Sequence, residues 1–61
     1  MPYVNVKVAG KLTKEQKEKI VEGITKLLEE VANKPPQSTY VVIDEVDREN
    51  WGKGGKLLSD L

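Results

Sequence analysis

The sequence of 61 residues contains no cysteine and no histidine. Without cysteine the chain forms no disulfide, and without either residue it lacks the usual ligands of zinc and haem sites. A chain this short buries only about 60% of the surface that it exposes when unfolded, so a single copy builds a marginal core. Because small domains compensate with disulfides, a metal or association, we expect residues 1–61 to form one domain that associates with further copies of itself.

Net charge and long apolar runs are also missing. The ten basic and ten acidic residues cancel, and their mixing along the chain leaves no basic stripe for nucleic acid. No apolar run approaches the roughly 20 residues that span a bilayer. The first five residues lack the positive and apolar regions of a signal peptide. The sequence therefore predicts a cytoplasmic protein that binds neither nucleic acid nor a membrane.

The residues that are present divide the chain into a strand, a helix and a second strand. Residues 3–8 alternate valine with other residues, which is typical of a half-buried strand. A helix is predicted from Thr13, whose spacing to Gln16 is that of a capping box, to about Asn33, because two prolines follow. Residues 39–44 are nearly continuous in apolar character, as in a strand that is covered on both faces. The apolar stripe of the helix, at 3.6-residue spacing, consists of Ile20, Val21, Ile24, Leu27, Leu28, Val31 and Ala32.

The last third of the chain is predicted to be mostly irregular. Residues 45–49 are polar and predict a turn, the glycine-rich residues 50–55 predict a turn or short hairpin, and residues 56–61 form a tail. Strand, helix and strand make one βαβ unit with parallel strands and a right-handed crossover. The predicted fold class is thus α+β, and neighbouring copies must cover the open edges and the free face of the sheet.

Proline at position 2 is the first candidate for chemistry. With no histidine or cysteine present, the group that titrates nearest to neutrality is the terminal amine, whose ordinary pKa is about 7.7–8.0. Removal of Met1, usual before a small residue, makes Pro2 a terminal secondary amine. An apolar pocket or a nearby cation would lower the pKa of this amine towards neutrality, so that Pro2 could act as a general base. If Met1 stays attached, the nitrogen of Pro2 is an amide, and Pro2 only starts a strand.

The sequence predicts no pair of carboxylates that could act together as acid and base. Asp44 and Glu45 are adjacent, and adjacent residues of a strand point to opposite faces of the sheet. They are therefore not predicted to act together as acid and base.

Four segments of the sequence, in order and without gaps, resemble the 4-oxalocrotonate tautomerase family: residues 1–4 (MPYV), 13–17 (TKEQK), 41–46 (VVIDEV) and 50–55 (NWGKGG). The resemblance implies a βαβ subunit with a short C-terminal hairpin. It implies dimers with a four-stranded sheet, three of which form a homohexamer. It also implies an isomerase that moves a proton within a keto–enol acid and needs no metal or organic cofactor.

The resemblance extends to part of the active site. The N-terminal proline that shuttles the proton matches Pro2, and an aromatic residue that walls the pocket matches Trp51. Two arginines, which usually bind the carboxylate of the substrate and polarise its carbonyl, have no match. Their positions hold Leu12 and Tyr40, which puts the usual dicarboxylate substrate in question.

Three residues are candidates to replace those arginines. Lys11 precedes a helix N-terminus, whose free N–H groups favour an anion, and it would bind a carboxylate as a point charge. Tyr40 could donate a hydrogen bond to an enolate oxygen. Arg48 is the only arginine of the chain and lies three residues before Trp51. The alternative interpretation is that Lys11 and Arg48 are surface charges and that Tyr40 and Trp51 only pack.

The resulting hypothesis is a tautomerase in which Pro2, freed of Met1, is the general base for a small 2-oxo or 2-hydroxy-dienoic acid. Two alternatives stay open. One is a hydratase, dehalogenase or decarboxylase of the same superfamily, in which a protonated proline acts as an acid. The other is a catalytically silent oligomeric module, because both usual arginines are absent.

Overall fold

The computed structural model describes all 61 residues. In chain order, strand β1 (Tyr3–Ala9) is followed by helix α1 (Lys14–Ala32) and strand β2 (Tyr40–Val46), and a hairpin of β3 (Gly52–Lys53) and β4 (Lys56–Leu57) comes last. Short 3₁₀ turns lie at Pro36–Ser38, Arg48–Asn50 and Leu58–Asp60. The predicted α+β class, with one βαβ unit and a short C-terminal hairpin, is confirmed.

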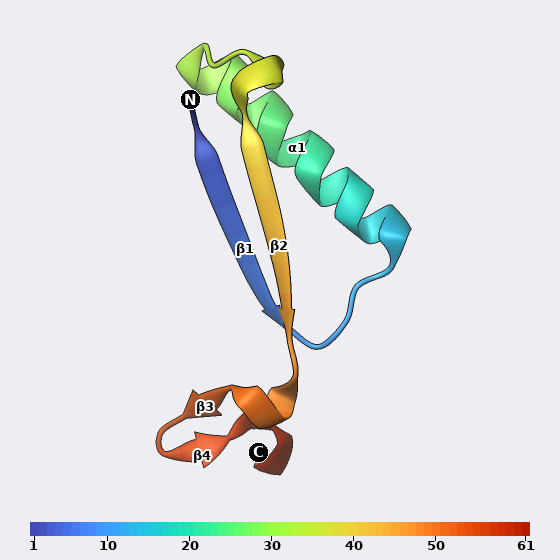
Figure 1. The fold of residues 1–61 in the computed structure, drawn as a ribbon, viewed down its shortest axis with the longest axis vertical. Helices are drawn as coiled ribbons and strands as arrows, with labels where there is room; N and C mark the ends of the chain where they lie inside the picture. Colours follow the sequence, from blue (N-terminus) through green and yellow to red (C-terminus); the bar gives the residue numbers. More distant parts are fainter.

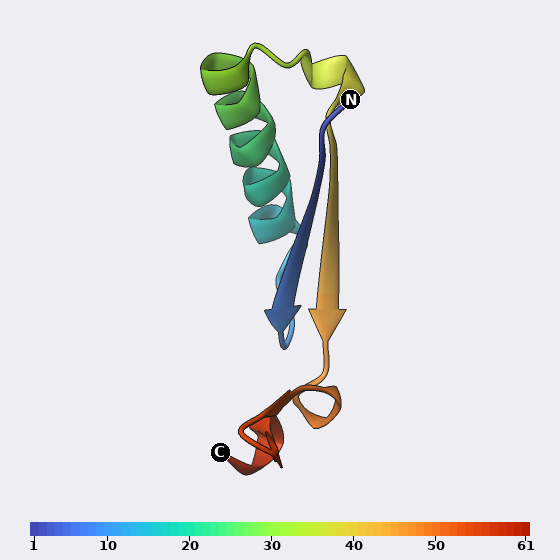
Figure 2. The ribbon, with the colours of Figure 1, turned by 90° about the vertical axis from the view of Figure 1, so that its left-hand side faces the viewer.

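Strands β1 and β2 are parallel, and α1 covers one face of the sheet that they form (Figures 1 and 2). The register pairs Tyr3 with Tyr40 at one end and Ala9 with Val46 at the other. Two further backbone bonds extend the ladder: the N–H of Tyr40 donates to Pro2 O at 2.9 Å, and the N–H of Gly10 donates to Val46 O at 2.9 Å. Both ends of the chain's β1 segment are therefore fixed to β2.

Local signals in the sequence define both ends of α1. Thr13 Oγ1 accepts the N–H of Gln16 at 3.1 Å and Gln16 Oε1 accepts the N–H of Thr13 at 2.9 Å, which completes the predicted capping box. At the other end Asn33 is left-handed with φ 61°, and the two prolines follow. None of the helices combines the length and the apolar character needed to cross a lipid bilayer.

The predicted boundaries of the second strand were wrong. Strand β2 begins one residue later than expected and continues through Glu45 and Val46, which had been assigned to a polar turn. Val46 pairs with Ala9 of β1, and the side chain of Glu45 is bonded to the start of α1. The strand can therefore include this charged residue, because the loop before α1 and the first turns of α1 supply hydrogen-bond donors for its carboxylate.

The C-terminal arm, residues 47–61, lies beyond the carboxyl ends of β1 and β2 (Figure 1). Its glycine-rich turn is a hairpin as predicted: Gly54 and Gly55 have φ +61° and +82°, which suits a tight hairpin turn. Lys56 and Leu57 belong to this hairpin, so the tail begins later than expected. Inside the arm the N–H of Leu58 donates to the carbonyl of Trp51 at 2.8 Å.

A single chain has no buried core: none of its 61 residues is fully buried. Leu27 and Val31 belong to the apolar stripe of α1 and are nevertheless 59% and 77% exposed in the single chain. On the other side of the sheet no element covers the open face, defined by Tyr3, Asn5 and Lys7 of β1 and Tyr40, Val42 and Asp44 of β2 (Figure 2). The double covering expected for β2 is not provided within one chain.

Candidate active site

Pro2 lies at the start of β1, half-buried at the end of the sheet. Its carbonyl is held by the N–H of Tyr40, while Met1 in front of it is 87% exposed. The backbone thus fixes Pro2 on its carbonyl side, and the residue bonded to its nitrogen is exposed to solvent. With Met1 attached this nitrogen is an amide, and removal of Met1 would convert it into a ring amine in a defined place.

Tyr40 is the one other candidate residue at this end of the sheet. Its register partner is Tyr3, and both side chains are exposed on the open face, away from α1. Pro2 precedes Tyr3 and therefore alternates to the helix side. Within one chain Tyr40 touches Pro2 through the backbone, and its phenol group lies on the other side of the sheet.

Lys11, Arg48 and Trp51 are placed at the opposite end. Lys11 follows the end of β1, and the other two belong to the C-terminal arm (Figure 1). The seven residues of β1 span roughly 23 Å at 3.3 Å per residue, so one chain keeps these three residues far from Pro2. The single chain also forms no pocket. The five candidates therefore form two groups, at opposite ends of one sheet.

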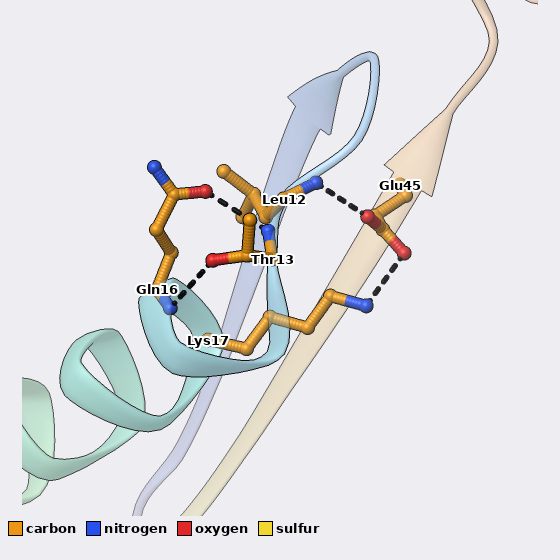
Figure 3. A network of polar contacts seen from close by, with 5 residues as sticks. All are labelled: Leu12, Thr13, Gln16, Lys17 and Glu45. Atoms are coloured by element: carbon orange, nitrogen blue, oxygen red, sulfur yellow. Dashed lines mark hydrogen bonds and ion pairs between the residues drawn. The ribbon is translucent and has the colours of Figure 1, made fainter.

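The loop that carries Lys11 is held by Glu45, a residue to which the sequence had given no role (Figure 3). Glu45 Oε2 accepts the N–H of Leu12 at 2.7 Å, and Oε1 accepts a bond from Lys17 Nζ at 2.8 Å. The Lys17 hydrogen bond, followed by that of Leu12, lowers the pKa of Glu45 below its ordinary value, and the charge of Lys11 adds to this effect. The sequence offered one signal for this role of Glu45, which is that an acidic residue stands near the end of the second strand. A carboxylate there can accept hydrogen bonds from the free N–H groups before a helix.

Asp44 and Glu45 point to opposite faces of the sheet, as predicted, and Asp44 lies on the open face. It accepts bonds from Lys7 Nζ and Asn5 Nδ2, each at 2.9 Å, so it shares no site with Glu45. The hydrogen bond from Lys7 lowers the pKa of Asp44 below its ordinary 3.8, and the same contact raises the pKa of Lys7 above 10.5. No three acidic side chains gather closely enough to hold a metal ion.

This pair predicts a pH-dependent contribution to stability. Because the pKa of Asp44 is lowered by folding, its contribution is present above pH 3.8 and is lost as the pH falls through the folded-state value. The Asp44→Asn variant should therefore unfold at lower urea concentration than the wild type at neutral pH, and the difference should shrink at about pH 3. Urea titrations followed by circular dichroism at both pH values provide the measurement. A difference that is the same at both would contradict the assignment.

The βαβ unit followed by a short C-terminal hairpin is the fold of a class of small enzymes, the tautomerases. The family model described as tautomerase enzyme matches residues 2–61. The chain therefore belongs to the tautomerase family, whose members are isomerases.

Individual tautomerases are similar to this chain over nearly its whole length. The probable tautomerase K2 of Dickeya dadantii (strain 3937) is 41% identical over 61 residues, which are 98% of this chain and 91% of the relative. The 2-hydroxymuconate tautomerase of Bacillus subtilis (strain 168) is 36% identical over 61 residues, which are 100% of this chain and 98% of the relative. A solved structure from work on the 4-oxalocrotonate tautomerase isozymes of Methylibium petroleiphilum has a TM-score of 0.86 at 31% identity and covers 95% of this chain and 94% of its own. These similarities place the chain among the 4-oxalocrotonate tautomerases.

Proposed function

We propose that the protein moves a proton between two positions of a small 2-oxo or 2-hydroxy-dienoic acid, with Pro2 as the general base once Met1 is removed. The observation that carries this proposal is the placement of Pro2: its carbonyl accepts a hydrogen bond from β2, the residue is half-buried, and Met1, which is bonded to its nitrogen, is highly exposed. A proton-transfer group has to be held in a fixed place, and this position provides that.

The proposed reaction is balanced without any further reagent. The Pro2 nitrogen takes a proton from the enol oxygen, or from carbon beside the carbonyl, and the electron pair of the broken bond moves into the conjugated system. The proton then returns from nitrogen to another carbon of the same molecule. The substrate and product are isomers, so no electrons are exchanged and no redox cofactor is required.

A complete site is proposed to need more than one copy of the chain. Two β1 strands that pair along their free edges by a twofold axis run antiparallel. The start of one strand, with Pro2, then lies near the end of the other, with Lys11. The absence of buried residues and of a pocket in the single chain supports such an assembly, and we propose a hexamer made of three dimers, each chain being one domain.

Substrate binding is proposed to fall to the residues brought in by neighbouring copies. Lys11 would hold the carboxylate as a point charge, with Arg48 as a second cation from the C-terminal arm. Tyr40 would donate a hydrogen bond to the oxygen that becomes negatively charged, and Trp51 would keep water out. The similarity to a 2-hydroxymuconate tautomerase supports an unsaturated 2-hydroxy acid as the substrate class.

The direct test is the Pro2→Ala variant, assayed for ketonisation of 2-hydroxymuconate and of phenylenolpyruvate. Alanine leaves a primary amine on a more mobile backbone, and we expect kcat/KM to fall by about 10²-fold, within the usual contribution of a general base. Pro36→Ala is the matched control, since Pro36 is exposed and is not one of the five candidate site residues. Unchanged turnover in Pro2→Ala would reject the assignment of Pro2. Absence of wild-type turnover on every enol acid tried would favour a catalytically silent module.

A further inference from the structure

In the loop between β1 and α1, residues 10–13, three of the four backbone N–H groups donate hydrogen bonds to other parts of the chain. The N–H of Gly10 is bonded to Val46 O at 2.9 Å, and the N–H of Leu12 is bonded to Glu45 Oε2 at 2.7 Å. The N–H of Thr13 is taken by Gln16 in the capping box. Lys11 is therefore held between two anchored residues, so the position of its backbone is set by β2.

Charge neutralisation is the second property of this network. Glu45 and Lys17 form an ion pair at 2.8 Å, with side chains that are 21% and 38% exposed. This pair is better shielded than the pair of Lys7 and Asp44 on the open face, whose side chains are 60% and 45% exposed, so solvent screens it less. The ammonium group of Lys11 has no hydrogen-bond or ion-pair partner in the chain. Lys17 thus occupies the carboxylate of Glu45 (Figure 3), so that this carboxylate does not pair with Lys11.

We propose that Glu45 and Lys17 are positioning residues that hold the loop and keep Lys11 available for the carboxylate group of the substrate. The inference rests on the proposed function, in which Lys11 binds that carboxylate. Glu45 does two tasks at once: one oxygen fixes the backbone next to Lys11, and the other is neutralised by Lys17. A free carboxylate at this place would attract Lys11 and repel the anionic substrate.

Substitution of either member should raise KM with little effect on kcat, because the loop with Lys11 binds the carboxylate while Pro2 transfers the proton. Glu45→Gln keeps an oxygen for Leu12 but loses the charge-assisted bonds, and Lys17→Met leaves the carboxylate of Glu45 without its partner. For both variants we expect KM for 2-hydroxymuconate to rise about tenfold, which corresponds to about 1.4 kcal/mol, while kcat changes less than about threefold. Lys17→Arg should restore KM, since arginine keeps the charge and the hydrogen bond.

Two further readouts separate positioning from a general loss of stability. Hydrogen exchange at the Leu12 amide, followed by NMR, should be at least about tenfold faster in Glu45→Gln if one charge-assisted bond is weakened. In a Lys11→Ala background, Glu45→Gln should add no further increase in KM, because it acts through Lys11. Asp44→Asn, which breaks the equivalent pair on the open face, is the matched control and should leave KM unchanged.

The outcomes distinguish this inference from the proposed function. If the wild type turns over no 2-oxo or 2-hydroxy-dienoic acid, both fail together. If the wild type is active and Pro2 is required, but Glu45→Gln and Lys17→Met leave KM unchanged, the positioning role alone is overturned. An equal rise of KM in the Lys11→Ala background would also overturn it, since the effect would then not pass through Lys11.

Discussion

A chain with one lysine inserted between Met1 and Pro2 should fold and assemble normally but lose its turnover. Removal of the initiator methionine requires a small second residue, so Met1 is retained before the inserted lysine and the nitrogen of Pro2 stays an amide. An amide nitrogen accepts no proton at working pH. We expect kcat/KM to fall by about 10²- to 10⁴-fold, the full contribution of a general base, and further than in Pro2→Ala, which keeps an amine.

The insertion is well suited to isolate chemistry from folding. Met1 is 87% exposed, and the hydrogen bond that fixes this end of the chain uses the carbonyl of Pro2, which the insertion leaves in place. A chain with the lysine added after Leu61 is the control for added length and charge. Intact mass confirms the terminus of each protein, and circular dichroism and light scattering confirm fold and assembly. Full turnover by the inserted chain, or an active wild type that retains Met1, would contradict the role of Pro2.

Features encoded by neighbouring residues were predictable from the sequence. The alternation in β1, the capping box of Thr13 and Gln16, and the end of α1 before two prolines depend on partners within about four residues, and each is found in the structure. The hairpin follows in the same way from the glycines at 54 and 55. The βαβ topology then follows because two parallel strands need a long crossover.

Features that depend on distant residues were not predictable. Strand β2 continues through Glu45 because its carboxylate is bonded to Leu12 and Lys17, which lie 33 and 28 residues away in the sequence. Leu27 belongs to the apolar stripe and is nevertheless exposed, because the pattern does not encode the width of the surface that the helix covers. For the same reason the sequence indicated five candidate site residues but not their distances. In the structure they lie in two groups at opposite ends of the sheet.

Introducing a charge on the open face should have the second large effect, on assembly and not on chemistry. Val42 lies on this face between Tyr40 and Asp44, and 40% of it is exposed in the single chain. If a further copy covers the face, glutamate at position 42 would be buried beside the carboxylate of Asp44. An ion removed from water without a partner costs several kcal/mol, and the like charge adds to the cost. Val42→Glu should therefore prevent association through this face.

Loss of association should also mean loss of structure. Because none of the residues is fully buried in the single chain, the separated subunit has little apolar burial with which to offset the entropy of folding. We expect Val42→Glu to have a lower mass than the wild-type assembly in light scattering and the circular dichroism of a largely unfolded chain. Lys26→Glu places the same residue on the exposed side of α1, and it should stay folded and assembled.

Wild-type stability should depend on chain concentration for the same reason. When folding and association are coupled, Tm rises with concentration by mass action, so dilution of the wild type should lower its Tm. An independently folded monomer would show a constant Tm. A Val42→Glu chain that keeps the mass and the circular dichroism of the wild type would show that the open face is not an interface, and the assembly that brings Lys11 of one copy to Pro2 of another would then have to form through the strand edges alone.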